Sequence, residues 1–347
     1  LTTLNGSNGF QISGEAANDA SGNSVSAAGD VNGDGFADLL IGALRANPNG
    51  SQSGASYVVF GHATGTLNRT GTEARDILSG GEFDDSFTGL GGDDFIRSGD
   101  GDDTINGGQG NDIIIDGAGN DTLNAGSGRD TILVTSGEDR IDGGSDKDLL
   151  DCRNLINAIN INLANGTFVH PNGEDLIALF SIEDVRGTAF NDVIVGGLAA
   201  NFLLGQAGND TLDGGASADL LEGGLGRDTM TGGAAADRFI FRAITESGNS
   251  AATRDIVTDF TVNPAAGAAF VDRIDLNVID AQAGTAGAQA FTFIAGAAFT
   301  AEGQVRAVQS GANTILEINT TGVGVADMTI QLSNFTATNL TAADFIL

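Results

Sequence analysis

Acidic residues recur every nine positions over two long stretches of this chain, and no other pattern in the sequence offers as much metal chemistry. Residues 71–151 divide without a gap into nine blocks of nine, and residues 187–240 give six more. Carboxylate oxygens are hard ligands, and several of them in a flexible arrangement favour calcium over zinc or copper. The sixth place of the blocks is occupied by Asp76, Asp85, Asp94, Asp103, Asp112, Asp121, Asp130, Asp139 and Asp148, and then by Asp192, Asn201, Asp210, Asp219, Asp228 and Asp237.

The remaining places of each block predict the elements that must position these acids. The eighth place is always apolar, and the first places are rich in glycine, which tolerates the positive φ of tight turns. The three residues after the Asp therefore predict a short strand whose middle side chain points inward. Two blocks form one coil of a parallel β-roll, and coils stack at roughly 4.8 Å. Each Asp then lies one coil above the Asp eighteen residues earlier, so that the acids form rows.

The best blocks, GGQGNDIII (107–115) and GQAGNDTLD (205–213), resemble the nonapeptide GGxGxDxUx of the RTX family. The resemblance implies calcium sites between blocks n and n+2, at most seven in the first array and four in the second. We expect fewer than these eleven, because Asn201, Phe83 and Thr72 to Ala74 interrupt the pattern. The predicted ligands are Asp94, Asp103, Asp112, Asp121, Asp130, Asp139, Asp148, Asp192, Asp210, Asp219, Asp228 and Asp237.

The alternative is that the acids only keep a glycine-rich surface soluble. Residues 71–151 carry 20 acidic and 5 basic residues, a net charge of -15. Stacked coils of that charge would repel one another unless cations neutralised them. Charge density therefore favours calcium binding over mere solubility.

The N-terminal segment contains a second kind of calcium loop. Residues 30–38 read DVNGDGFAD and precede the apolar run LLI, with oxygen-bearing side chains at loop places one, three, five and nine but no Glu at place twelve. With its flanking strands, the segment over about residues 8–62 resembles one FG-GAP repeat of the integrin alpha propeller. The resemblance implies one calcium ion held by Asp30, Asn32, Asp34, the Phe36 carbonyl and Asp38; the alternative is a plain turn.

One such blade cannot close a propeller, which typically needs four to eight. We therefore expect either the last blade of a truncated propeller or a cap on the first coil of the roll. Open strand edges on such a blade invite pairing with another chain, so self-association through residues 8–62 is a hypothesis.

Residues 152–186 lose the repeat and predict a hairpin insertion. Alternating apolar residues flank Asn165-Gly166, and a second Asn-Gly follows at 172–173. We expect this insertion to shield one end of the roll. Cys152, the only cysteine, is expected to be a small buried apolar residue, and His62 and His170 are expected to be solvent or turn histidines rather than zinc ligands.

Residues 241–347 contain strand-like runs in place of nonapeptides, among them residues 255–260, 291–294 and 314–318. Together with the chain ending, they are similar to the C-terminal domain of serralysin-type secreted metalloproteases. That resemblance implies a domain that finishes the β-roll and carries an uncleaved signal for a type I secretion exporter at Asp344, Phe345, Ile346 and Leu347. The alternative, in which the last residues dock a final strand, is compatible with a signal.

Several functions are disfavoured by composition. A formal net charge of -31, from 46 acidic and 15 basic residues, disfavours nucleic acid and anionic membrane as partners. The sequence has no His-Glu-x-x-His or Gly-x-Ser-x-Gly motif, so we expect no catalysis. The sequence contains no run of eighteen apolar residues and therefore predicts no membrane span. The first thirty residues do not resemble a signal peptide, so we expect any export to use another route. Because the chain starts at Leu1 and not at Met, we expect a fragment or a processed form.

These observations predict an all-β protein made of a parallel RTX β-roll in two arrays, a β-sandwich-like C-terminal domain and one propeller-like blade. The expected segments are 1–70, 71–151, 152–186, 187–240 and 241–347. The leading hypothesis is a secreted, calcium-loaded structural, adhesive or matrix protein outside a Gram-negative bacterium. The alternatives are the secretion and folding tail of a larger protease, lipase or polysaccharide epimerase, and a calcium-dependent module that binds cell-surface glycan. The blade favours the first, since secretion tails usually follow a catalytic domain directly.

Overall fold

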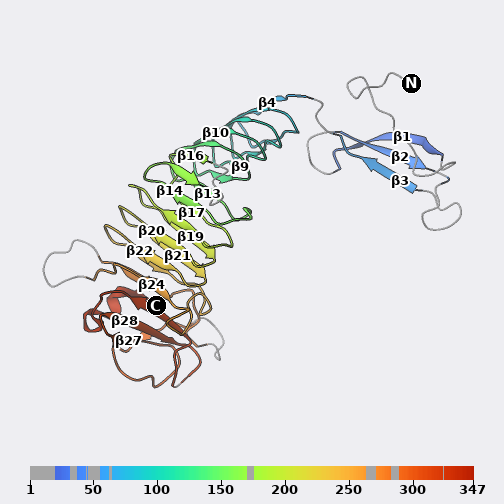
Figure 1. The fold of residues 1–347 in the computed structure, drawn as a ribbon. Coiled ribbons are helices and arrows are strands. Elements are labelled where there is room, and N and C mark those ends of the chain that lie inside the picture. The colour runs from blue at the N-terminus through green and yellow to red at the C-terminus, as the bar shows by residue number, and fades with distance from the viewer. Residues whose placement is uncertain are drawn as a thin grey trace.

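The fold is all-β, as predicted, and its centre is a parallel β-roll (Figure 1). A computed structural model describes residues 20–31, 37–43, 45, 55–61, 65–169, 176–262, 271–282, 289–322 and 324–347. In this part of the chain, no helix has the length and apolar character needed to cross a membrane. Two turns of 3-10 helix, η1 (Ala337–Asn339) and η2 (Ala342–Asp344), lie near the C-terminus.

Within the described residues, the roll is built from a sixteen-stranded sheet and an eleven-stranded sheet, called here the longer and the shorter sheet. The longer sheet runs in the order β26 (Thr292–Phe293), β27 (Gln304–Ser310), β28 (Asn313–Asn319), β29 (Met328–Leu332), β24 (Asp255–Val257), β22 (Thr229–Thr231), β20 (Thr211–Asp213), β18 (Val193–Val195), β14 (Asn160–Asn162), β15 (Thr167–Val169), β16 (Leu176–Phe180), β12 (Arg140–Ser145), β10 (Thr122–Ser127), β8 (Thr104–Gln109), β6 (Ser86–Gly91) and β4 (Asn68–Thr70). The shorter sheet runs β30 (Phe345–Ile346), β25 (Arg273–Asp275), β23 (Arg238–Ile240), β21 (Leu220–Leu225), β19 (Phe202–Ala207), β17 (Asp184–Arg186), β13 (Leu149–Asp151), β11 (Thr131–Leu133), β9 (Ile113–Ile115), β7 (Phe95–Arg97) and β5 (Ile77–Ser79).

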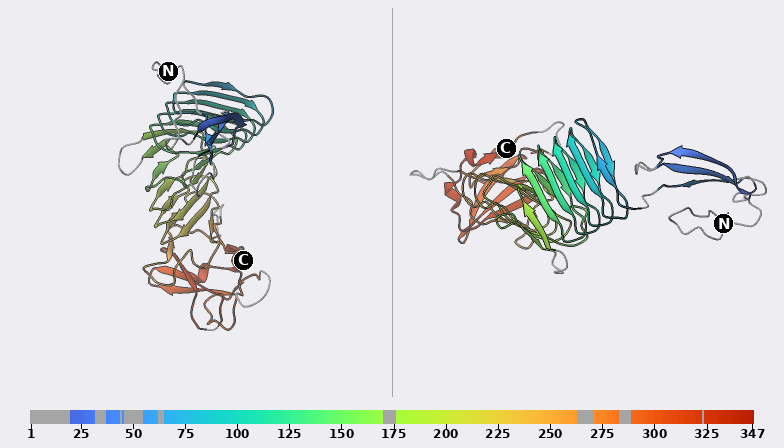
Figure 2. Two further views of the ribbon diagram at one scale, coloured as in Figure 1. Left: turned by 90° about the vertical axis from the view of Figure 1, so that its right-hand side faces the viewer. Right: turned by 90° about the horizontal axis from the view of Figure 1, so that it is seen from above.

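Consecutive coils stack with a register of eighteen residues, as the nonapeptide pattern predicts. Ile114 of β9 pairs with Ile132 of β11, which pairs with Leu150 of β13, and all three side chains are fully buried. Figure 2 shows the parallel strands lying one behind another along the roll. The eighth-place side chains therefore form a narrow core between the two sheets.

The turns between strands depend on glycine in the left-handed region. Gly108 and Gly110 have φ of +114° and +124°, and a Cβ atom on Gly108 would lie 2.4 Å from the Leu90 carbonyl oxygen of the preceding coil. The backbone conformation and the close approach of the coil below both exclude a side chain here.

The expectation that residues 152–186 shield one end of the roll is wrong. A hairpin does form at Asn165-Gly166, where β14 and β15 pair in antiparallel fashion. However, β14 pairs with β18, β15 with β16, and β16 with β12, so the insertion lies inside the longer sheet and joins the two arrays. Its strands have open hydrogen-bonding edges on both sides, and pairing with both arrays satisfies them.

The shorter sheet joins the same two arrays directly. β13 pairs with β17, which pairs with β19, and an ion pair of 2.9 Å connects Arg186 with the buried carboxylate of Asp151. Cys152, next to this ion pair, is fully buried, which confirms its role as a small core residue.

The C-terminal region extends both sheets. β24 and β29 continue the longer sheet, and β25 and β30 continue the shorter one. The ring of Phe260 contacts Phe239 of the last nonapeptide at 6.1 Å and Phe335 at 5.7 Å between centroids. The roll and this region therefore share one core.

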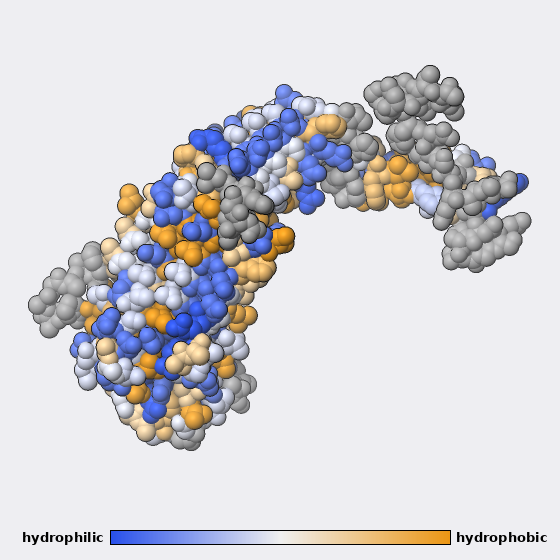
Figure 3. Space-filling view, viewed as in Figure 1, coloured by the Kyte–Doolittle hydropathy of each residue, from blue (hydrophilic) through white to orange (hydrophobic). Residues whose placement is uncertain are grey.

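The N-terminal blade is a three-stranded antiparallel sheet of β1 (Ser21–Gly29), β2 (Asp38–Ala43) and β3 (Ala55–Val59). Figure 1 shows it set apart from the first coil. Several of its large apolar side chains are exposed, and apolar surface is visible over this part of the molecule in Figure 3. They are Val25, Leu39, Leu40, Val58 and Phe60.

A pair of neighbouring substitutions in β9 tests how the roll is stabilised. Ile114 is fully buried, whereas 42% of Ile113 is exposed. We expect Ile114→Ala to lower the free energy of unfolding by about 2–4 kcal/mol, because it leaves a cavity in a close-packed core. Ile113→Ala should cost less than about 1 kcal/mol. Urea unfolding at fixed free calcium would measure both, and equal losses would contradict the inward and outward alternation.

Candidate metal sites

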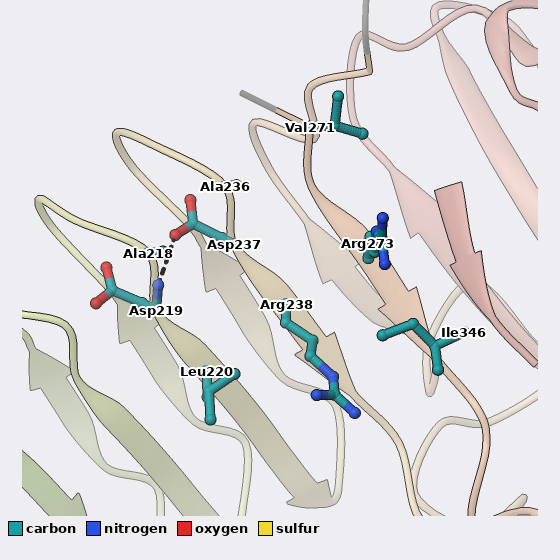
Figure 4. Close-up of a pocket in the computed structure, with 9 residues that line it drawn as sticks. All are labelled: Ala218, Asp219, Leu220, Ala236, Asp237, Arg238, Val271, Arg273 and Ile346. Atoms are coloured by element: carbon teal, nitrogen blue, oxygen red, sulfur yellow. Dashed lines mark hydrogen bonds between the residues drawn. The ribbon is translucent and has the colours of Figure 1, made fainter. Parts of the chain in front are cut away.

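The sixth-place acids form ladders in which one carboxylate oxygen is held by the neighbouring coil. In a regular rung, the backbone N–H of one sixth-place residue donates to Oδ1 of the Asp one coil later. Asp103 donates to Asp121 at 2.8 Å, and Asp112 donates to Asp130 at 2.7 Å. The rung between Asp219 and Asp237, 2.9 Å long, is drawn in Figure 4.

The ladders form two rows, one beside each sheet. The longer-sheet row contains Asp85, Asp103, Asp121 and Asp139, is interrupted at the hairpin, and resumes with Asp192, Asp210, Asp228 and Asp255. The shorter-sheet row runs through both arrays as Asp76, Asp94, Asp112, Asp130, Asp148, Glu183, Asn201, Asp219, Asp237 and Asp272. At the interruption, the register places Ile177 where an acid would stand, because Arg140 pairs with Ala178.

The second carboxylate oxygen, Oδ2, is the atom that a bound cation would satisfy. It is buried and has no hydrogen-bond partner in Asp94, Asp103, Asp112, Asp121, Asp130, Asp148, Asp210, Asp219, Asp228, Asp237 and Asp255. A buried carboxylate oxygen without a partner is costly, and native proteins normally satisfy such atoms. Because these oxygens recur at the same place in successive coils, a cation between coils would satisfy them in series.

In most blocks, a glycine at the first place leaves space beside this oxygen. A Cβ atom on Gly107 would lie 2.5 Å from Oδ2 of Asp112 and 2.4 Å from the carbonyl oxygen of Ala125. On Gly205, it would lie 2.3 Å from Oδ2 of Asp210. Carboxylate and carbonyl oxygens therefore converge on a gap kept free of side chains, and these are the ligands that calcium prefers.

Four acids near ends of the rows differ, because a backbone N–H occupies their Oδ2 atoms. Oδ2 of Asp76, Asp85 and Asp192 accepts from Thr72, Gly81 and Thr188, at 2.6, 2.9 and 2.6 Å. Oδ2 of Asp272 accepts from Thr261 at 2.7 Å. Of these four, Asp192 is a predicted ligand, and its hydrogen bonds set it apart from the interior acids.

Burial raises the pKa of the ladder acids, and repulsion from acids in neighbouring coils adds to the effect. The pKa of Asp103 and of Asp112 rises to about 6, and that of Asp121 to about 7. The pKa of Asp210 and of Asp255 rises to about 8, where hydrogen bonds from backbone N–H groups only partly oppose burial. Without a cation, the folded roll therefore holds extra protons near neutral pH.

The structure adds three ladder residues that the nonapeptide pattern misses. Asp255 and Asp272 accept the backbone N–H groups of Asp228 and Asp237 at 2.8 and 2.9 Å, although 27 and 35 residues separate the partners. Glu183 accepts from Asp148 at 3.1 Å. Each of the three is followed two residues later by a buried or core-facing apolar residue, namely Val257, Ile274 and Val185. That acid-x-apolar signature is visible in the sequence once the strict nine-residue spacing is relaxed.

Asn201 fills its rung without a charge. Its Oδ1 accepts from Gly197 at 2.8 Å, and its Nδ2 donates to the Glu183 carbonyl at 2.6 Å. The amide thus meets its own hydrogen-bonding needs, and the position offers no carboxylate.

A second, outer ladder at the fifth place was not predicted. The backbone N–H of Asn120 donates to Oδ1 of Asp102 at 2.8 Å, and Glu138 donates to Oδ1 of Asn120 at 2.9 Å. These groups are exposed, and their bonds run from the later coil to the earlier one, opposite to the inner ladder. The recurrence of Asp or Asn at the fifth place is the signal that could have revealed it.

In the N-terminal loop, Asp38 is the buried acid. Its Oδ2 accepts from Val31 at 2.6 Å and its Oδ1 from Gly61 at 2.8 Å, so it ties the start of β2 to the end of β3. Asp30 is exposed at the end of β1. The predicted ligands Asn32, Asp34 and Phe36, as well as His62 and His170, lie outside the described residues.

The C-terminal tetrad is folded into the protein. Asp344 accepts from the backbone N–H of Thr341 at 2.7 Å in a capping box, and Phe345 pairs with Ile274 while its ring contacts Phe293 at 4.8 Å. Ile346 borders a pocket of about 450 Å³ beside Asp219, Asp237, Arg238 and Arg273 (Figure 4).

Comparison with known families identifies both kinds of repeat. Residues 70–105, 98–132, 125–151, 186–221 and 213–242 match the RTX calcium-binding nonapeptide repeat, and residues 21–59 match the FG-GAP repeat. No curated protein matches the chain. The chain therefore carries calcium-binding repeats, as the spacing of its acids predicts.

Solved structures with similarity to the chain include two modules of one enzyme. The AlgE6R2 subunit of the Azotobacter vinelandii mannuronan C5-epimerase is 23% identical over 48% of this chain and 92% of its own, with a TM-score of 0.33. The AlgE6R3 subunit is 26% identical over 47% and 77%, with a TM-score of 0.27. The extracellular lipase LipA from Serratia marcescens is 15% identical over 83% of this chain and 40% of its own, with a TM-score of 0.29.

The raised pKa values predict how the calcium-free roll responds to pH. An unfolded Asp has a pKa of about 3.9, whereas Asp112 and Asp210 have about 6 and about 8 in the fold. Between these limits the folded roll binds more protons than the unfolded chain, so the free energy of unfolding should fall as pH rises from about 5 to about 8. Circular dichroism in chelator between about pH 5 and about pH 8 would measure it, as a fraction of residual β structure that falls as the pH rises. With saturating calcium the trend should reverse, because protons then compete with the metal. A calcium-free roll that gains stability over this range would contradict the buried-carboxylate account.

Proposed function

From the RTX calcium-binding repeats and the FG-GAP repeat that this chain carries, we propose that it is a secreted protein that folds on extracellular calcium. In this proposal, it leaves a Gram-negative cell unfolded through a type I exporter. Outside, it acts as structural, adhesive or matrix material and performs no catalysis itself.

The observation that carries the proposal is the series of buried, unpartnered Oδ2 atoms in the two rows. Each is held in place by the rung on its Oδ1 side, as between Asp112 and Asp130. Without cations, the successive charged acids of each row would face one another at single-strand spacing, and each strand offers only a short apolar contact to offset the repulsion. Calcium would remove the repulsion and satisfy the oxygens together.

Calcium concentration supplies the switch between the two states. The sites require two coils to be stacked, so they do not exist in the unfolded chain, and binding free energy becomes folding free energy. Extracellular calcium modules commonly bind at ~0.1 to 1 mM, far above free cytosolic calcium. The chain would therefore stay threadable inside the cell and fold after export.

The position of the C-terminal tetrad supports the same order of events. Phe345 is buried against β25 and Phe293, so an exporter could read this ending as a free segment only before the roll is complete. A signal at Asp344 to Leu347 is therefore compatible with its final place as a strand.

The blade supports an adhesive role over that of a simple enzyme tail. Among the described residues, β1 and β3 are the edges of a three-stranded sheet with exposed apolar side chains. A sheet this small is marginal alone, so further blades or a second copy of the chain would cover it. A single blade joined directly to a catalytic domain would favour the alternative of an enzyme's secretion tail.

We expect the chain to be largely unfolded in chelator and to gain β structure cooperatively in millimolar calcium. Magnesium should substitute poorly, because it demands tighter octahedral geometry. Far-ultraviolet circular dichroism and protease resistance would measure the transition. A roll that keeps its spectrum and its protease resistance in excess chelator would contradict the proposal that it folds on binding calcium.

Two substitutions provide the matched control for this transition. Asp112→Ala removes a rung and an unpartnered carboxylate, and should raise the calcium midpoint several-fold. Asn201→Ala removes a rung that carries no charge, and should shift the midpoint less. Equal shifts would mean that the rungs act through hydrogen bonds alone and not through calcium.

Deleting Asp344 to Leu347 should stop export yet leave calcium binding by the arrays nearly intact, because none of the four belongs to a ladder. Secretion would be measured as protein in the medium of a cell that contains a type I exporter. The calcium-induced dichroism of the purified truncated chain is the control. Normal accumulation of the truncated protein in the medium would overturn the assignment of the signal.

A further inference from the structure

The first place of one block holds an acid where the repeat normally has glycine. Asp116 begins the block that contains Asp121, and it is fully buried. Ser98, Ala125 and Val134 also replace glycine at this place, but none of them carries a charge. Asp116 is therefore the one place-one residue of the two arrays that adds a carboxylate to the interior.

The carboxylate of Asp116 lies among those of two ladder acids. Oxygen atoms of Asp116, Asp121 and Asp139 lie within 4.8 Å of one another, and all three residues are buried. A regular gap between coils, such as that between Asp94 and Asp112, is faced by two successive ladder acids. At the gap beside Asp116 there are three acids.

The two oxygens of Asp116 have different surroundings. Its Oδ1 accepts from the backbone N–H of Thr135 at 2.9 Å and from the hydroxyl of Thr135 at 3.2 Å, which fixes the orientation of the side chain. Its Oδ2 is buried and has no hydrogen-bond partner, and neither has Oδ2 of Asp121. Two of the three clustered carboxylates thus each carry a buried oxygen without a hydrogen-bond partner.

Resting on the proposed calcium function, we propose that Asp116, Asp121 and Asp139 form a three-carboxylate cation site that differs from the other ladder sites. Asp116 is its extra ligand. Three carboxylates attract a divalent cation more strongly than two, and the number of charged ligands is a principal means by which proteins tune calcium affinity. This site would fill first as calcium rises, and it would take a trivalent lanthanide best, because three negative charges then match three positive ones.

The test uses the full chain and the substitution Asp116→Asn. Asparagine keeps the size of the side chain and the oxygen that Thr135 holds, but it removes the charge. We expect the tightest class of sites in a calcium titration to weaken about tenfold or more in this variant. In Eu³⁺ direct-excitation spectra of the wild type, the three-carboxylate site should give a line of its own, shifted by the higher charge of its ligands. This line should be missing in Asp116→Asn.

Two further variants make the result specific. Ser98→Gly restores glycine at the same place of an earlier block without altering charge, and should keep both the tightest class and the shifted Eu³⁺ line. Asp116→Gly restores the repeat consensus and should also lose the tightest class. Asp116→Gly also replaces Asp116→Asn in the test if circular dichroism shows that Asp116→Asn fails to fold in calcium.

The outcomes separate this site from the proposed function. If the wild type binds neither calcium nor Eu³⁺, the proposed function fails. If it binds both in one uniform class, or if Asp116→Asn keeps the tightest class, the three-carboxylate site is wrong while the calcium function stands. A gain of one bound calcium in Asp116→Gly would also overturn it, because Asp116 would then occupy the place of a cation.

Discussion

The fold depends on the ladder aspartates, whose two carboxylate oxygens have different surroundings. At Asp112, at Asp121 and at most other interior ladder acids, one oxygen accepts a backbone N–H from the neighbouring coil, and the other is buried without a hydrogen-bond partner. The first bond sets the eighteen-residue register of the coils. The second oxygen makes that register costly unless a cation lies between them, because burial of an unsatisfied charge is far more expensive than the gain from one hydrogen bond. In the proposed function, folding and cation binding are consequently one process.

The apolar core alone cannot take over this role. Each short strand contributes one inward side chain, such as Ile114 or Ile132, and the core therefore consists of one line of such residues from each of the two sheets. Glycine turns such as those at Gly108 and Gly110 let the backbone of successive coils approach closely, at the cost of greater conformational freedom in the unfolded chain. A structure with a thin core and many glycines needs a stabilising ligand, as small domains generally do.

Continuity of the two sheets explains how separate repeat arrays behave as one unit. The shorter-sheet row crosses from the first array to the second through Glu183 and Asn201, and it ends at Asp272 within the C-terminal region. The ending of the chain then closes the shorter sheet through Phe345. Strand pairing is therefore continuous from the first array, across the hairpin, to the last strand of the C-terminal region.

The sequence by itself determined the repeat, the acids, the inward apolar line and the eighteen-residue stacking, because these follow from a strict nine-residue period and the pleat of a strand. It also predicted the hairpin at Asn165-Gly166, because turn chemistry is local. Only the tertiary structure decided where that hairpin lies, which acids continue the ladders at Glu183, Asp255 and Asp272, and which oxygen of each acid stays unpartnered. These depend on strand pairing between residues 27 to 38 positions apart, as between Thr229 and Ile256 or Arg140 and Ala178, and on the approach of particular backbone N–H groups. The same is true of Asp116. In the sequence it is only a departure from the glycine of the repeat, and the tertiary structure shows that its carboxylate lies beside those of Asp121 and Asp139.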